Sequence, residues 1–406
     1  MAFLHGIEHI DLASDFGPVN DIVTAVIGLI GTSDDSMENP VEQNKLILCT
    51  SEKDDAQFGN LGTIPEALRA IRMQASRRGS ALVFVVSIEG TGTEGAVLPS
   101  DIIGEITPTG VRTGLKLFET ARGKYGFEPM IYIAPRFSAI AAIKNELQAI
   151  ANKAEAMSYI DSPDGMTFTE AIEGRASGQF ANLDEGIKFL FPHFLVANPD
   201  FVDEETTPTE QPLLNLPMSA FMAGLRAKVD LERGWHWSSS NQRVYGIEGM
   251  DVDLSFSLGD PGCEANLLNA AGVVTAVQMF GNGIVEWGNY TAGFPGNTGV
   301  DAFECVRRTR AIMKRAIEAA CVPFIDRPFI QANVDAIRNT INQYLNQLVG
   351  QGKLVYGKCF YRVESNPIGQ LAMGHLTFDI EFTPAIPMQR LTFTYKIDLT
   401  QLANIV

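Results

Sequence analysis

The sequence lacks the usual marks of an enzyme, a secreted protein or a membrane protein. Its 406 residues hold five cysteines that are far apart and form no Cys-x-x-Cys pair, which indicates reduced thiols from a cytoplasmic folding environment. No stretch of about 18 uncharged apolar residues occurs, so a membrane span is not expected. The opening MAFLHGIEHIDLASD has no basic segment followed by an apolar run, and a signal peptide is not expected either.

Catalytic and metal-binding motifs are equally scarce. The sequence contains no GxSxG, no HExxH and no Walker loop. The histidines at 5 and 9 have a four-residue spacing, but their segment favours an extended conformation and offers no third ligand. His193 and His375 lie in apolar strand patterns and are interpreted as structural. The sequence therefore predicts no metal, no cofactor and no catalytic residues.

One motif raises the possibility of nucleotide binding. Residues 90–95 match GxGxxG directly after an apolar strand pattern, as in dinucleotide-binding loops. A true loop of this kind opens a helix whose N-terminus faces the phosphates, whereas here AVLPSDIIGE follows, without helical period. Glu94 also places a negative charge where an anion would sit. We interpret the motif as a glycine-rich surface loop, and keep a nucleotide-dependent α/β enzyme as the alternative function.

Charge is unevenly distributed along the chain. The net charge of −17 would repel a phosphate backbone, so nucleic acid is not an expected partner. Residues 1–300 hold 39 acidic and 19 basic side chains, a balance of −20, whereas residues 301–406 hold 9 and 12, a balance of +3. The last quarter either carries one solvated basic helix or a surface that meets an acidic partner.

Short apolar runs alternate with helical patterns between residues 22 and 215, which predicts a mixed α/β layer with parallel pairing. The acidic, proline-bearing stretch 198–216 reads as a linker or a surface loop. Helical patterns cover 217–232, 302–320 and 329–348. Strand patterns cover 354–363, 371–382 and 391–397. In the last of these, one face carries Leu391, Phe393, Tyr395 and Ile397.

The helix expected over 302–320 is basic. A helical projection places Val306, Met313 and Ile317 on one side and Arg308 and Arg315 on the other. Arg307 and Lys314 lie on the flank. We predict that these four cations meet an acidic protein surface.

The most unusual segment extends from Gly234 to Thr291. It contains GWHWSSSNQRVYGIEG, NLLNAAGVVTAV and VEWGNYT, in which glycines and asparagines mark fixed turns. His236 lies between Trp235 and Trp237 without a nucleophile motif, so we interpret it as a packing residue. With the helix FMAGLRAKVDLERGWHWSSSN before it and VRRTRAIMKRAI after it, this segment resembles the contractile tail sheath proteins of bacteriophages and tailocins. The openings HGIEHID and TAVIGLIGTSDD are also similar to that family.

The resemblance implies a structural subunit of a sheath around a phage tail tube, with no enzymatic activity. It implies a multi-domain mixed α/β fold with an N-terminal arm over 1–20, an outer α/β domain over 21–215, an inner domain over 216–388 and a C-terminal arm over 389–406. The arms would add β-strands to neighbouring subunits. The expected arm residues are Phe3, Ile7, Ile10, Leu12, Leu391, Phe393, Tyr395 and Ile397, although 391–397 also fits an ordinary core strand. The expected tube-facing residues are Arg307, Arg308, Lys314 and Arg315.

The same resemblance implies the partners. They are further copies of the sheath subunit, the tail tube protein, and baseplate and tail terminator proteins. The subunit would be assembled in the host cytoplasm and reside in the virion tail sheath. Another virion component, such as a capsid or baseplate protein, remains a further alternative to the sheath.

Overall fold

The computed structural model describes residues 23–34, 40–198 and 212–400. An eight-stranded sheet forms the centre of the molecule, in the order β11-β10-β6-β5-β4-β1-β3-β2. The pairs from β10 to β3 are parallel, whereas β2 and β11 pair antiparallel at the two edges. The strands are β1 Val26–Gly31, β2 Leu46–Cys49, β3 Leu82–Ser87, β4 Ile131–Ile133, β5 Met157–Asp161, β6 Ile187–Leu190, β10 Val273–Met279 and β11 Gly283–Trp287.

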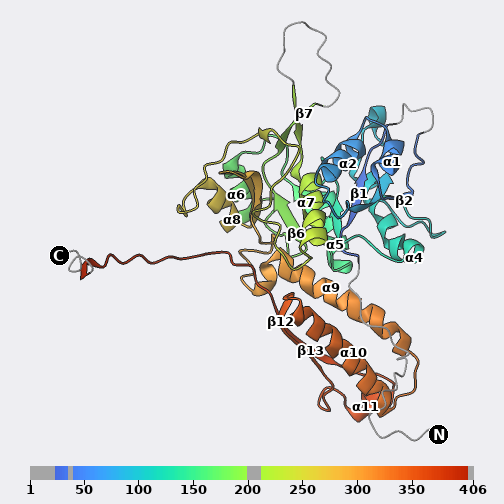
Figure 1. Cartoon of the computed structure of the whole chain (residues 1–406). Coiled ribbons are helices and arrows are strands. Elements are labelled where there is room, and N and C mark those ends of the chain that lie inside the picture. Colours follow the sequence, from blue (N-terminus) through green and yellow to red (C-terminus); the bar gives the residue numbers. More distant parts are fainter. Residues whose placement is uncertain (1–22, 35–39, 199–211, 401–406) are drawn as a thin grey trace, which may run out of the picture.

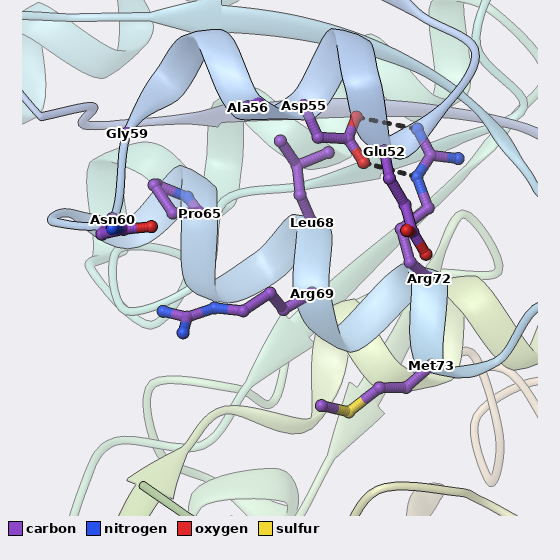
Figure 2. Close-up of a pocket in the computed structure, with 10 residues that line it drawn as sticks. All are labelled: Glu52, Asp55, Ala56, Gly59, Asn60, Pro65, Leu68, Arg69, Arg72 and Met73. Carbon is purple, nitrogen blue, oxygen red and sulfur yellow. Dashed lines mark hydrogen bonds and ion pairs between the residues drawn. The ribbon is translucent and has the colours of Figure 1, made fainter. Parts of the chain in front are cut away.

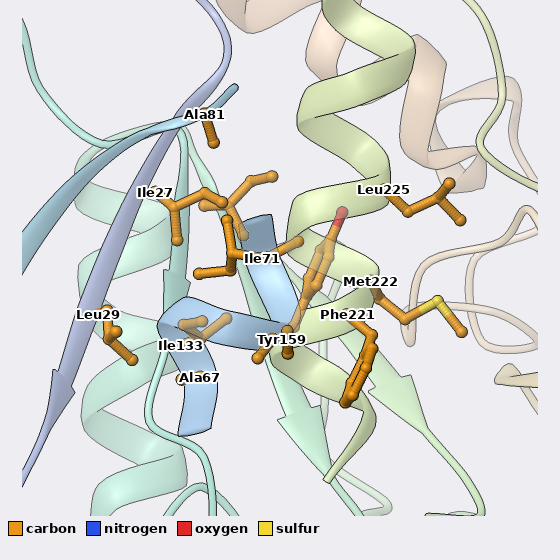
Figure 3. Close-up of a cluster of buried hydrophobic side chains, with 14 of the residues drawn as sticks. Ile27, Leu29, Ala67, Ile71, Ala81, Ile133, Tyr159, Phe221, Met222 and Leu225 are labelled. Carbon is orange, nitrogen blue, oxygen red and sulfur yellow. The ribbon is translucent and has the colours of Figure 1, made fainter. Parts of the chain in front are cut away.

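Helices cover both faces of this sheet, which explains why its strands are continuous apolar runs rather than alternating ones. In β1, Ile27 and Leu29 face α2 (Thr63–Met73) and α7 (Met218–Glu232), and Figure 3 shows their side chains packed together. Val26 and Ile30 face the opposite layer. That layer contains α3 Pro99–Ile103, α4 Ala121–Tyr125, α5 Ala141–Lys153, α6 Phe168–Ala176 and α8 Glu264–Ala270. The short α1 (Glu52–Asp55) precedes α2.

A glycine sets the close approach of α7 to α2. A Cβ atom at Gly224 would lie 2.9 Å from the backbone of Ile71 in α2, so no larger residue fits without moving the helices apart. α7 thereby joins the sheet core, although we expected it to open a separate inner domain.

The expected domain boundary between residues 215 and 216 is therefore wrong as a boundary between folding units. β10 and β11 follow that point in the chain but complete the same sheet, because β10 pairs in parallel with β6. The stretch expected as a linker is flanked by β7 (Phe194–Ala197) and β8 (Leu213–Leu216), which pair antiparallel; β9 (Gly249–Met250) completes this small sheet.

A second folding unit lies below the sheet in Figure 1. It contains α9 Glu304–Cys321, α10 Gln331–Gly350, β12 Leu354–Phe360, α11 Ile368–Leu371 and β13 Asp379–Pro384. Its own apolar core joins Ile312, Met313, Tyr344, Leu345 and Leu348. β13 begins later than the expected strand over 371–382, because α11 and the positive φ of Gly374 turn the chain first.

Candidate assembly surfaces

The two-stranded sheet of the C-terminal unit offers unpaired strand edges. β12 and β13 pair antiparallel with each other and with no other strand of the described chain. At the outer edge of β12, the Asn342 side chain of α10 accepts from the backbone N–H of Cys359 at 2.8 Å and donates to its carbonyl at 3.0 Å. This side chain therefore covers the β12 edge at that residue. The outer edge of β13 has no equivalent helix contact among the residues described, so it is the more open of the two.

The segment after β13 leaves the body as an extended chain (Figure 1). Its expected strand residues have no strand partner among the described residues, and they are largely exposed: Leu391 66%, Phe393 71%, Tyr395 90% and Ile397 85%. Four large apolar side chains in a row at this exposure are unfavourable in water. The core-strand alternative is wrong within this chain, because these side chains do not enter its core.

The start of this extension is held by residues at the end of the Gly234–Thr291 segment. The Tyr290 hydroxyl donates to Gln389 Oε1 at 2.8 Å, and Gln389 Nε2 donates to Asn289 Oδ1 at 3.3 Å. Tyr290 itself stacks between Phe294 and Phe303, with ring centroids at 4.1 and 4.6 Å. The extension therefore leaves the body at a defined point. The N-terminal arm residues Phe3, Ile7, Ile10 and Leu12 lie outside the described residues.

The basic helix differs from its expected arrangement. Arg308 and Arg315 are buried, so their assignment to an exposed tube-facing surface is wrong. Arg308 pairs with Asp230 of α7, and Arg315 binds Glu128 at 3.3 Å. The physical reason is that α9 is covered on two sides, by the sheet body and by α10, whereas the projection assumed one buried face. Two expected residues are more accessible: Lys314 pairs with Glu155, and the partly exposed Arg307 donates to Asn152 at 3.2 Å.

A buried network of charges joins α9 to the sheet body. Lys188 of β6 pairs with Glu286 of β11 and, at 2.6 Å, with Glu304 at the first turn of α9. Asp230 of α7 pairs with Arg226 at 2.8 Å and with Arg308. All six side chains are almost completely buried, and the three cations balance the three carboxylates. The network was not predicted, because its members are ordinary single charges in sequence.

Burial alone would raise the pKa of Glu304, but the positive charges of Lys188, Arg226 and Arg308 outweigh it and lower this pKa from 4.5 to about 2. Burial raises the pKa of Glu286, against the opposing charge of Lys188. Glu286 and Glu304 thus share the Lys188 ammonium group. Glu304 also lies near the guanidinium groups of Arg226 and Arg308, so it stays ionised to lower pH than Glu286 does.

We expect this arrangement to make folding sensitive to acid. Since the pKa of Glu304 is lowered in the folded state, its contribution is complete above about pH 4.5 and is lost as the pH falls towards about 2. The free energy of unfolding, measured with urea between pH 7 and pH 2, should fall less with decreasing pH for Glu304→Gln than for the unaltered chain. If both proteins lose stability equally over this range, Glu304 is not the source of the acid sensitivity.

The segment from Gly234 to Thr291 supplies structural parts rather than chemistry. Trp235 packs in the core of the C-terminal unit, and Ser239 donates to Glu286 at 3.1 Å in the buried network. The carbonyl of Trp237 accepts from Arg226 at 2.6 Å. His236 makes edge contacts with the two tryptophan rings, as its interpretation as a packing residue predicts.

The glycine loop at 90–95 is occupied by the chain's own carboxylate. Asp101 of α3 accepts from the backbone N–H and the hydroxyl of Thr91, at 3.0 and 2.7 Å, and from the N–H of Leu98 at 2.8 Å. A short helix, α3, does follow the motif, contrary to expectation, but its five residues begin after the glycines. Within the motif, Thr91 donates to Asp101, and the N–H groups of Gly92 and Gly95 donate to the carbonyls of Ala96 and Gly92. These donors are therefore already used within the chain, which gives the enzyme alternative no support.

Two other places resemble binding sites. A hollow of about 450 Å³ lies between α1 and α2, and Figure 2 shows the Asp55 carboxylate already paired with Arg72 at its edge. Asp164, His193 and Asp251 have potential metal-ligand atoms within 4.8 Å of one another. Hydrogen bonds account for this group: Asp251 accepts from the His193 backbone at 2.8 Å, and Asp164 accepts from Asn215 at 2.8 Å.

The helices of the described residues include none with the length and apolar character that a membrane span requires.

Two family models match the chain. The model of the phage tail sheath protein central domain covers residues 110–292, and that of the phage tail sheath C-terminal domain covers residues 302–398. The break between them falls just before α9, in agreement with the two folding units and not with the expected boundary at 215.

Relatives and solved structures agree with these matches. The chain is 30% identical to the tail sheath protein of Burkholderia phage BcepMu, over 97% of both chains, and 31% identical to the major tail sheath protein of Serratia phage KSP20, over 96% and 94%. Its fold is similar to the contracted sheath of an extracellular contractile injection system, PVC, with a TM-score of 0.71, 16% identity and 99% of both chains covered. For the contracted helical sheath of the anti-feeding prophage, the TM-score is 0.69 at 17% identity, with 98% and 100% covered. The mixed α/β fold is thus confirmed, and the chain belongs to the family of phage tail sheath proteins.

Proposed function

We propose that this chain polymerises into a helical sheath around a phage tail tube and that contraction of the sheath drives the tube through the host envelope. The observation that carries the proposal is the exposed apolar extension over 391–397, which has no partner strand among the described residues. Pairing with another subunit would bury its side chains and satisfy its backbone groups.

The open edge of β13 is the proposed receiving surface. Asn342 already covers the edge of β12 at Cys359, so an incoming extended segment meets less competition at β13. Backbone pairing of this kind tolerates large rigid-body movements of the subunits, because a linker can turn while the strand stays bound. The segment's defined exit beside Tyr290 and Gln389 would place the linker at a constant position on each subunit.

The more specific partners belong to the same proposal. The tail tube would meet the accessible cations of α9, namely Lys314, Arg310 and the partly exposed Arg307. These contacts are polar and modest, as contacts that contraction must break should be. Baseplate and terminator proteins would bind the two ends of the cylinder. Assembly would take place in the host cytoplasm, and neither a nucleotide nor a catalytic step takes part.

Negative-stain electron microscopy tests the proposal. The purified chain, alone or produced together with its tube protein, should form long hollow cylinders that pellet in the ultracentrifuge. An enzyme or a capsid protein would give small particles or closed shells instead. Monodisperse small particles under both conditions would refute the sheath function.

A further inference from the structure

A polar recess of about 380 Å³ lies beside the C-terminal half of α7. It is lined by that helix, by residues 241–245 and by the tip of the β10–β11 hairpin at Asn282. Its charged side chains are Lys228, Arg233, Arg243 and Glu232. The recess thus gathers three cations and one carboxylate on a chain whose net charge is −17. A positive site on an otherwise negative molecule needs a physical explanation.

Aromatic rings hold these cations in place. The Lys228 ammonium lies 4.2 Å from the ring centroid of Tyr245, and the Arg243 guanidinium lies 5.1 Å from the same ring. Arg233 lies 5.2 Å from the centroid of Trp237. Among the residues described, no carboxylate lies within ion-pairing distance of these three cations, whereas Lys314 and Arg226 have such partners. Ring faces attract cations but leave their N–H groups open to a ligand.

These features select an anionic ligand of extended shape. Two guanidinium groups and an ammonium group are suited to carboxylates, to which arginine donates in pairs. Exposed apolar surface lies nearby: Trp237 and Tyr245 are about half exposed, and Phe280 on the neighbouring hairpin is fully exposed. Tryptophan, tyrosine and arginine together are typical of the energetic centre of a protein interface. The ligand is therefore expected to combine carboxylates with at least one large apolar side chain.

We infer that this recess binds the acidic segment 200–210 of a second copy of this chain. The segment, DFVDEETTPTE, contains five carboxylates, no cation and the apolar pair Phe201 and Val202. The inference rests on the proposed function, because it adds a contact between sheath subunits. The recess is separate from the β13 edge and from the C-terminal extension.

The recess and the segment belong to different surface elements of the subunit. The segment connects β7, at the top of the body in Figure 1, to its antiparallel partner β8. The recess is built from other elements, namely the C-terminal half of α7, residues 241–245 and the tip of the β10–β11 hairpin. A contact between two different surfaces of a subunit is heterologous. Repeated heterologous contacts generate open helical assemblies, in contrast to closed dimers.

A peptide titration tests the inference directly. A fluorescent peptide with the sequence of residues 199–211 is titrated with the full-length chain, and its anisotropy is measured at 50 and 500 mM salt. The unaltered chain should bind, with an affinity that falls at least tenfold at high salt. Lys228→Glu with Arg243→Glu should weaken binding at least tenfold at low salt. Lys45→Glu with Lys53→Glu, which changes the net charge equally at exposed positions away from the recess, should bind as the unaltered chain does.

Assembly provides the second arm of the test. Glu204→Lys with Glu205→Lys should impair cylinder formation, and combining it with the two recess reversals should restore cylinders. Equal peptide binding by the recess and control variants, or equally strong binding of a scrambled peptide, would overturn the inference. If the unaltered chain forms no cylinders, the proposed function fails whatever the peptide does. Normal cylinders without peptide binding would overturn the recess assignment alone.

Discussion

Removal of residues 390–406 is expected to leave a folded subunit that cannot polymerise. The described part of this segment contributes no side chain to the apolar cores, and Leu391, Phe393, Tyr395 and Ile397 are exposed. Its loss should therefore change the melting temperature by no more than about 2 °C, since exposed side chains contribute little to stability. Polymerisation should fall by more than tenfold, because each contact in the cylinder loses its connecting strand.

Sedimentation and circular dichroism separate these two effects. A matched control replaces Leu391, Phe393, Tyr395 and Ile397 by serine in the full-length chain. This variant keeps the backbone of the extension but loses the apolar face, so it should assemble weakly. Cylinder formation by the truncated chain at the concentration at which the full-length chain assembles would show that the extension is not the connecting strand.

The second large effect concerns the buried charge network. Asp230→Ala should lower the free energy of unfolding by about 3–5 kcal/mol, because it leaves Arg226 and Arg308 buried without their shared carboxylate. Since Arg308 belongs to α9, loss of this pair should also loosen the attachment of the C-terminal unit to the sheet body. Urea unfolding and hydrogen exchange along α9 measure the two consequences.

The control is an ion pair on the surface. Asp335 binds Arg338 at 2.8 Å on α10, and both side chains are more than one-third exposed. Asp335→Ala should cost less than about 1 kcal/mol, since water screens such pairs. A similar small loss for Asp230→Ala would mean that the network does not hold α9 to the body.

Local patterns were sufficient to predict most of the sheet and its helices. Within the predicted α/β layer, the apolar runs 25–30, 81–88 and 157–160 correspond to β1, β3 and β5, because both faces of a parallel sheet are buried. Patterns were insufficient at residues 264–287, where α8, β10 and β11 lie within the segment interpreted only as a family signature. The position of β10 beside β6 depends on pairing between residues 84 positions apart, Val273 with Phe189 (273 − 189), and local periodicity carries no information on such long-range pairing.

Prediction of the candidate surfaces was uneven for a similar reason. The alternation of Leu391–Ile397 predicted a strand, whereas in this chain the segment forms no strand and its apolar side chains are exposed. The helical projection failed for Arg308 and Arg315, because it contains no tertiary contacts. Arg308 pairs with the buried Asp230 of α7, and Arg315 pairs with Glu128. Charges at ordinary sequence positions become structural only through tertiary contacts.

Helical reconstruction of the assembled cylinders by cryo-electron microscopy would locate the C-terminal extension of every subunit. Residues 391–397 of one subunit are expected to form a strand in the sheet of a neighbour, hydrogen-bonded along the outer edge of β13. Cylinders in which this segment contacts only its own subunit, or lies away from the β12–β13 sheet of every neighbour, would contradict this expectation.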